Sequence, residues 1–356
     1  MGSRVVARLL VSCSIAVAFV GVAQAGETGL PAVELVRILT PQPAGASDAV
    51  IGSRGLFVAD RMDSALIRYD TSGKEVARYQ KGGTAPGSLS QHVFVALEGD
   101  RLFAWSSRGA LMRFEAASLA FEREEKTGMV GPAGRFFFAK GRFYMIGPGW
   151  MRQEPDALEY FWSEADPPSA RGESRSVIWR LNEKGINARS MDLGFRPLAA
   201  QIPGGGFWIL RFDKYEVARV SEAGQLVQVL SLRPPRAFRA RTRELGKDEM
   251  DPRQRFRYYR WLAEASILVA PVALGTESFG IVRMELGGDG AGPPRWFMDV
   301  YDSSGRPLSL DQALPLSGRH LLGLRGLTRT SFEAVEVSKD FSEPGSEHRW
   351  VRVRLR

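Results

Sequence analysis

The amino-acid sequence predicts an all-β fold in which small antiparallel sheets repeat around a ring, and three observations lead to this prediction. Short apolar runs are separated by tight turns that contain Asp, Ser and Gly. Little of the chain has apolar residues at helical spacing. The strand-and-turn unit also recurs along the chain, with six occurrences that begin at Gly55, Arg101, Arg142, Gly206, Phe279 and His320. Because a meander cannot bury its faces alone and radial repetition protects sheet edges, we predict a six-bladed β-propeller with one helical insertion.

The N-terminal segment, residues 1–25, has the pattern of a secretory signal. Arg4 and Arg8 precede an almost wholly apolar run from Leu9 to Val22, and Ala23-Gln24-Ala25 is a typical cleavage site. We therefore expect export to the periplasm or the extracellular space, with residues 26–356 as the propeller domain and no integral membrane segment after cleavage. Cys13 ends a lipobox-like "LVSC", but most of the apolar run follows it, so we do not expect a lipid anchor there.

The first unit, Gly55–Tyr79, shows how each blade is built. The apolar run Leu56–Ala59 predicts a strand that is buried on both faces. Leu66–Tyr69 predicts a second strand, and the segment "DTSG" from Asp70 to Gly73 predicts a tight turn, because Asp and Ser bond back to the backbone and Gly accepts a positive φ. The segment "VARY" then begins a third strand, which completes an antiparallel meander.

Residues Gly55 to Glu115 resemble the NHL-repeat family. "LFVAD" is similar to its strand ending in Asp, "LIRYDTSGK" to its strand and turn, and Gly82–Trp105 to its Gly/Pro linker and following strand pair. His92 stands where that family often has proline. The resemblance implies a six-bladed propeller and says little about activity. The same residues also resemble YVTN-type repeats, whereas the dipeptides and even spacing of WD-type repeats are absent.

Two insertions interrupt the regular spacing, at 148–175 and 233–265. With the strands of a blade labelled A to D from the axis outward, "RFYMIG" reads as a B strand and "SVIWRL" as a C strand. The first insertion is then a B–C loop and the second a D–A loop, which emerge on the same face of a meander. We expect binding on this elaborated face. The aromatic residues Trp150, Tyr160 and Trp162 either pack on the ring or offer a stacking surface to a sugar or peptide.

The second insertion contains the predicted helix. Asp251 is a candidate N-cap and Pro252 suits the first helical position. The helix has an apolar stripe and a basic face, formed respectively by Phe256, Tyr259, Leu262 and Ala263, and by Arg253, Arg257, Arg260 and Glu264. Two interpretations remain open: a structural flap with a solvated basic face, or a lid over the channel whose arginines meet an anionic ligand.

The ring must also close, and both chain ends offer a strand for this. Val33–Leu39 and Trp350–Arg356 are strand-like, and we expect one to complete the last blade beside the other. The sequence does not show which of the two strands is outermost. It also leaves open whether a seventh, irregular blade exists.

The sequence contains no recognisable catalytic constellation. His92, His320 and His348 are the only histidines and lack metal-ligand spacing. Gluconolactonase-type lactonases resemble the predicted fold and bind a divalent metal partly through Asn, but the chain has only Asn182 and Asn187, which we place at an outer turn. Strand-end carboxylates are expected to form turns, namely Asp60, Asp70, Asp299 and Asp302.

The resulting hypothesis is an exported, non-catalytic propeller that binds a small molecule, glycan or protein on the elaborated face. No cofactor is expected, and the net charge of +8 is not taken as a nucleic-acid signal in an exported chain. The alternative is a metal-dependent lactonase, hydrolase or lyase with its site at the central channel. Candidate ligand-binding residues are His92, Trp150, Tyr160, Trp162, Arg253, Arg257 and Arg260.

Overall fold

The fold is taken from a computed structural model of the chain. The structure describes residues 31–355, with gaps at 90–92, 107, 127–134, 140–141, 149–157, 166–173, 182–197, 212–213, 241–254, 288–291 and 340–344. The predicted signal segment, with Cys13, lies outside these residues, as do the predicted helix cap and both asparagines.

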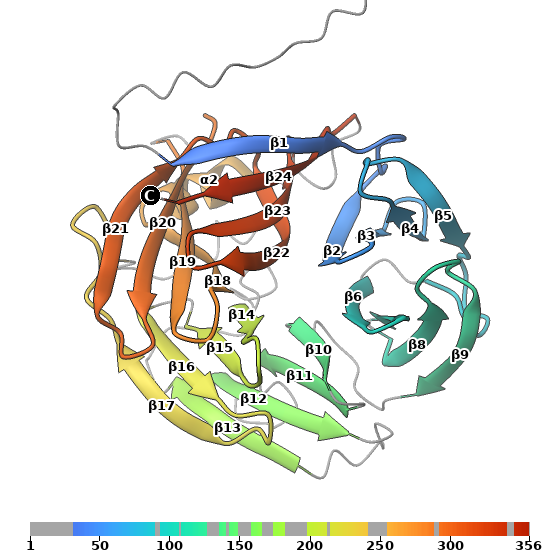
Figure 1. The fold of residues 1–356 in the computed structure, drawn as a ribbon, viewed down its shortest axis with the longest axis horizontal. Coiled ribbons are helices and arrows are strands. Elements are labelled where there is room, and N and C mark those ends of the chain that lie inside the picture. Colours follow the sequence, from blue (N-terminus) through green and yellow to red (C-terminus); the bar gives the residue numbers. More distant parts are fainter. Residues whose placement is uncertain are drawn as a thin grey trace, which may run out of the picture.

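The predicted all-β propeller fold is confirmed. The described residues form six four-stranded antiparallel sheets arranged around a common axis (Figure 1). The first three sheets are β2 (Ala46–Gly52), β3 (Gly55–Asp60), β4 (Ala65–Tyr69) and β5 (Glu75–Gln80); β6 (Val93–Glu98), β7 (Arg101–Ser106), β8 (Ala110–Glu115) and β9 (Phe121–Lys126); and β10 (Arg135–Ala139), β11 (Arg142–Pro148), β12 (Leu158–Ala165) and β13 (Ser174–Leu181).

The other three sheets follow the same plan. They are β14 (Leu198–Gln201), β15 (Phe207–Leu210), β16 (Glu216–Val220) and β17 (Leu226–Ser231); β18 (Ile267–Ala273), β19 (Ser278–Glu285), β20 (Arg295–Asp302) and β21 (Pro307–Leu314); and β22 (His320–Thr328), β23 (Ser331–Val337), β24 (His348–Arg354) and β1 (Ala32–Ile38). The inner strands β2, β6, β10, β14, β18 and β22 contact one another in this order around the ring, and β22 returns to β2.

The first unit folds as the sequence predicts. Strand β3 is buried along its whole length. At the turn between β4 and β5, the backbone N–H groups of Ser72 and Lys74 donate to Asp70 Oδ1 over 2.8 and 3.1 Å, and Gly73 has φ +80°. The turn residues therefore act through the backbone contacts that their chemistry favours.

Ring closure joins the two ends of the described chain. Strand β1 pairs antiparallel with β24, with Val33 opposite Val353 and Leu35 opposite Val351. β1 is the outermost strand of this sheet and β22 the innermost, which settles the order that the sequence leaves open. Directly after β1, Leu39 is buried in a cluster that spans this sheet and the β2–β5 sheet. The closing strand is thus held both by its ladder and by apolar packing.

The prediction for the first insertion is wrong in one respect. Residues Leu158–Ala165 form strand β12, the C strand of their sheet, and "SVIWRL" lies in β13, the D strand. Tyr160 and Trp162 therefore belong to a strand and not to a loop. The aromatic residues of "LEYFWSEA" alternate with polar neighbours too weakly to indicate a strand, and pairing with β11 and β13 decides the structure.

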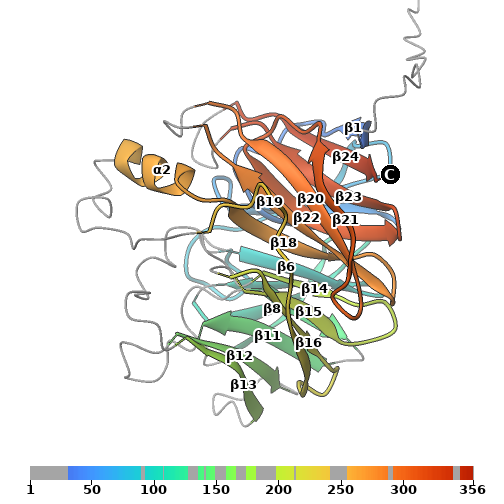
Figure 2. The ribbon, with the colours of Figure 1, turned by 90° about the vertical axis from the view of Figure 1, so that its left-hand side faces the viewer.

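The second insertion connects β17 to β18, from the D strand of one blade to the A strand of the next. It contains helix α2 (Arg255–Ala263), which projects from one face of the ring (Figure 2). Trp261, Leu262 and Ala263 are buried against Leu286, whereas Arg257 and Arg260 are exposed. Among the described side chains of α2, those at the C-terminal end are packed, and those of Arg257 and Arg260 are exposed.

Candidate ligand site at the channel mouth

The inner strands surround a cavity of about 720 Å³, here called the channel pocket. Residues from β2, β6, β10, β14, β18 and β22 contribute to its lining, so every sheet contributes. A cavity of this size lies in the range of small-molecule pockets, which is about 300–1,000 Å³.

Small and aliphatic side chains form most of the wall of the channel pocket. They include Ala49, Ile51, Val95, Leu97, Ala199 and Ala200. Along the inner strand β2, period-two alternation places Ala49 and Ile51 in the apolar core shared with the β22–β24 sheet, and Val50 against the core shared with the β6–β9 sheet. The apolar character of the wall favours a ligand with an apolar body.

Two glycines of β22 allow close approach of its neighbours at the wall of the pocket. A Cβ at Gly326 would lie 1.8 Å from the carbonyl oxygen of Ala273 in β18. Gly323 has φ +59°, and a Cβ there would lie 3.1 Å from the carbonyl oxygen of Ala49 in β2. These two positions need glycine because backbone occupies the space of a side chain. Leu324 and Arg325, between them, line the cavity.

Four polar side chains line the same cavity: Glu98, Gln201, Glu222 and Arg325. Arg325 is half-buried and, within the described part of the chain, forms no ion pair. A guanidinium group beside an apolar wall is a strong site for a carboxylate, because the bidentate hydrogen bonds form where water competes little. Glu98 and Glu222 give the pocket acidic groups as well, so it suits a ligand of mixed polarity.

Part of the lining of the channel pocket lies on the face of the ring opposite α2. Residues 202–205 form the turn between β14 and β15, where Gly205 N–H donates to the carbonyl of Ile202 over 3.0 Å, and Glu222 lies between β16 and β17. A–B and C–D connections share one face of a meander, whereas α2 lies in a D–A connection on the other. The described polar pocket residues are therefore on the face opposite to the predicted one.

The residues predicted as ligand-binding are not brought together at this cavity. His92, Trp150 and Arg253 lie outside the described residues. Tyr160 and Trp162 are in β12, and Arg257 and Arg260 are on the exposed side of α2. None of the residues that line the channel pocket was singled out from the sequence. The segment "GLRG" in β22 carried a signal, because a charged residue between two glycines is unusual in an inner strand.

The predicted turn carboxylates divide into two groups. Asp60 accepts the backbone N–H groups of Ala44 and Gly45, and Asp302 accepts those of Ser304 and Arg306, so both hold turns as predicted. For Asp299 the prediction is wrong, because this residue lies inside β20 and is fully buried. Pairing with Ile281 places Asp299 within the ladder, three residues before the turn at Asp302.

A buried ionic network surrounds Asp299. Arg283, on the neighbouring strand β19, donates to Asp299 over 2.9 Å and to Glu285 over 2.8 Å, and it also pairs with Asp311. The Tyr215 hydroxyl donates to Asp299, and Asp311 N–H donates to it over 2.7 Å. Burial raises the pKa of Asp299, although the guanidinium group and these donors favour its charged form. Because the groups satisfy one another within the blade, we interpret the network as structural.

The described histidines do not form a metal site. His348 is fully buried in β24, and its Nδ1 lies 3.2 Å from Gln42 Oε1 and 3.1 Å from the carbonyl oxygen of Ser346. His320 is the first residue of β22. In the described part of the chain, no group of three or more His, Cys, Asp or Glu side chains has the arrangement to hold a metal ion. Among the helices of the described residues, none is long and apolar enough to span a membrane.

Comparison with known proteins shows similarity in fold. None of the family models matches the sequence, and no curated protein does. A member of the DUF4221 family from Bacteroides vulgatus has a TM-score of 0.61 with 10% identity, covering 90% of this chain and 98% of that one. A "Putative exported protein" from Bacteroides fragilis has a TM-score of 0.54 with 12% identity, covering 92% and 98%.

The WD40 repeats of RRP9 are similar to the same extent. Their TM-score is 0.53 with 12% identity, and the match covers 91% of this chain and 100% of that one. At sequence identities this low, the similarity indicates a shared architecture and does not indicate a shared ligand, since one fold hosts many functions. The chain is therefore similar in fold to β-propeller proteins of several kinds.

Proposed function

We propose that this protein is an exported, six-bladed, NHL-like propeller that binds a small organic ligand without chemical turnover. The channel pocket is the observation that carries the proposal, because it combines an aliphatic wall with the guanidinium group of Arg325. A ligand with an aliphatic body and a carboxylate fits both features. The signal pattern of residues 1–25 supports export.

The face bearing α2 is a second proposed contact surface, for a protein partner or a glycan. Arg257 and Arg260 are exposed there. This part of the proposal rests on the position of the insertion in a D–A connection, since loops at such positions often carry binding residues in propeller-like scaffolds.

Calorimetric titration of the purified protein with hexanoate and with hexan-1-ol tests the channel proposal. The two probes share an aliphatic chain and differ in the carboxylate. We expect hexanoate to bind at least about tenfold more tightly, since about 1.4 kcal/mol corresponds to one decade. Arg325→Gln should abolish the difference, and Ala200→Phe should weaken both probes by filling the cavity.

Arg236→Gln is the matched control, since it removes an exposed arginine from the connection between β17 and β18 that does not line the pocket. It should leave both affinities unchanged. Equal binding of the two probes, or an effect of Arg236→Gln as large as that of Arg325→Gln, would reject the channel pocket as a carboxylate site.

A further inference from the structure

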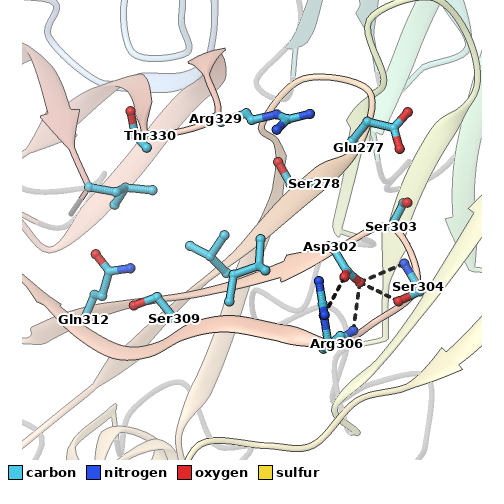
Figure 3. A pocket seen from close by; sticks show the side chains of 13 residues that line it. Glu277, Ser278, Asp302, Ser303, Ser304, Arg306, Ser309, Gln312, Arg329 and Thr330 are labelled. Atoms are coloured by element: carbon cyan, nitrogen blue, oxygen red, sulfur yellow. Dashed lines mark hydrogen bonds and ion pairs between the residues drawn. The ribbon is translucent and has the colours of Figure 1, made fainter.

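A second cavity, here called the interblade pocket, lies between the β18–β21 sheet and the β22–β24 sheet (Figure 3). Its volume is about 480 Å³. Three hairpin ends contribute to it: Glu277 and Ser278 where β18 turns into β19, Asp302, Ser303, Ser304 and Arg306 where β20 turns into β21, and Arg329 and Thr330 between β22 and β23. It shares no lining residue with the channel pocket, so the two cavities are separate.

One pair of charges in the interblade pocket is already satisfied. Arg306 Nε lies 3.0 Å from Asp302 Oδ2, while Asp302 Oδ1 accepts the N–H groups of Ser304 and Arg306, each over 3.0 Å, and the Ser304 hydroxyl over 2.6 Å. Both carboxylate oxygens therefore have partners within the hairpin, as the dashed lines of Figure 3 show. This pair shapes the wall and has little capacity left for a ligand.

Glu277 and Arg329 differ from that pair. Both side chains are exposed at the same side of the pocket (Figure 3), and within the described residues neither forms an ion pair or a side-chain hydrogen bond. The pocket therefore offers one carboxylate and one guanidinium group without internal partners. A ligand that carries an ammonium group and a carboxylate would neutralise both, and hydrogen bonds between charged groups are stronger than neutral ones.

The remaining wall selects for an aliphatic ligand with hydrogen-bonding groups. Val300, Leu308 and Leu355 provide apolar surface, and Leu308 is 54% exposed, which is high for leucine. The hydroxyl groups of Ser309 and Thr330 can bond a peptide group. Among the described residues, no aromatic side chain lines this cavity, so they provide no stacking surface of the kind on which sugar rings usually pack.

We infer that the interblade pocket binds a short zwitterionic peptide or amino acid with an aliphatic side chain. Arg329 receives the carboxylate, Glu277 receives the ammonium group, and Leu308 with Val300 packs against the side chain. A dipeptide fits the volume of the cavity. This site goes beyond the proposed channel function and does not depend on it.

Calorimetric titration of the purified protein with the dipeptide Ala-Leu tests the inference. Two blocked forms, N-acetyl-Ala-Leu and Ala-Leu amide, each remove one charge. We expect Ala-Leu to bind with a dissociation constant below about 1 mM and each blocked form to bind about tenfold more weakly, as the loss of one charge-assisted contact predicts.

Two variants assign each charge to its residue. Arg329→Gln should weaken Ala-Leu about tenfold and remove the penalty for the amide, while keeping the penalty for the acetylated form. Glu277→Gln should show the reverse pattern. Both residues are exposed in turns, so neither substitution is expected to affect folding.

Arg236→Gln and Arg325→Gln serve as controls. Both should leave Ala-Leu binding unchanged, and the second separates this site from the channel pocket. The inference is overturned if Ala-Leu gives no binding, if the blocked forms bind as tightly as Ala-Leu, or if Arg325→Gln abolishes binding.

Discussion

Arg283 and Asp299 form an ion pair of 2.9 Å in which both side chains are fully buried. They lie on adjacent strands, β19 and β20, and the Arg283 guanidinium also lies 4.2 Å from the ring centroid of Phe297. Charges in a dry interior need partners, because desolvation is costly. Tyr215 adds a donor from the neighbouring sheet, so the network ties two blades together.

Removal of one partner of this pair should destabilise the protein strongly. Asp299→Ala leaves the Arg283 charge with an incomplete set of acceptors, and we expect a loss of about 3–5 kcal/mol in the free energy of unfolding. Chemical denaturation measures it. Asp302→Asn, at an exposed turn on the same strand, is the control and should cost much less. Similar losses for the two variants would show that the buried network contributes little.

Closure of the ring by β1 should depend on packing as well as on the ladder. Leu39 is 1% exposed and Leu35 is 50% exposed, which provides two leucines at almost the same place in the chain. Leu39→Ala should cost about 2–5 kcal/mol, whereas Leu35→Ala should cost below about 0.5 kcal/mol. Thermal and denaturant unfolding of the two variants check this. Equal costs would contradict the buried position of Leu39.

Acidification should destabilise the protein through His348. Burial lowers the pKa of His348 in spite of the nearby Asp60 carboxylate and a backbone hydrogen bond. Its Nδ1 faces two acceptor oxygens and carries the proton, and Nε2 is buried without a partner among the described residues. A depressed pKa means that the unfolded state binds the proton more tightly. Stability is therefore complete above the ordinary histidine pKa of about 6.5 and falls as the pH decreases below it.

The measurement is the free energy of unfolding between pH 7.5 and 5.0, for the natural protein and for His348→Gln. The variant should lose less stability on acidification, because it has no group to protonate at this position. Parallel curves for the two proteins would assign the pH dependence to other groups.

Because β22 lies very close to β18, we expect the protein to require glycine at position 326. Gly326→Ala places a methyl group 1.8 Å from the Ala273 carbonyl oxygen, so backbone must move, and we expect a cost of about 1–3 kcal/mol or more. Gly292→Ala is the matched control, since no atom lies within 4 Å of the added carbon. Thermal unfolding of the two variants measures the difference in stability. A Gly326→Ala protein as stable as the control would mean that the inner strands are less closely packed than described.

Much of the fold follows from short stretches of sequence. The turn at Asp70 and Gly73, the buried strand β3 and the apolar side of α2 at Leu262 all depend on residues within one or two turns of each other. Local hydrogen bonding and hydrophobic periodicity encode such features directly. The radial arrangement follows from their repetition.

The errors concern features that depend on distant partners. Strand β12 has a weak pattern and becomes a strand through pairing with β11 and β13. Asp299 meets Arg283 only because the register of β19 and β20 makes them diagonal neighbours, with Arg283 opposite Phe297 and Asp299 opposite Ile281. The position of β1 outside β24 likewise needs the closed ring.

By itself, the sequence determined the strand-and-turn unit, its repetition and the position of the second insertion. The tertiary structure decided which strand closes the ring and which charges are buried. It also brought Arg325, Glu98 and Glu222 to one cavity from three blades, and Glu277 and Arg329 to another from two. The reason is physical: turns and strands form from neighbours in the chain, whereas each of these pockets is assembled from residues of two or more blades.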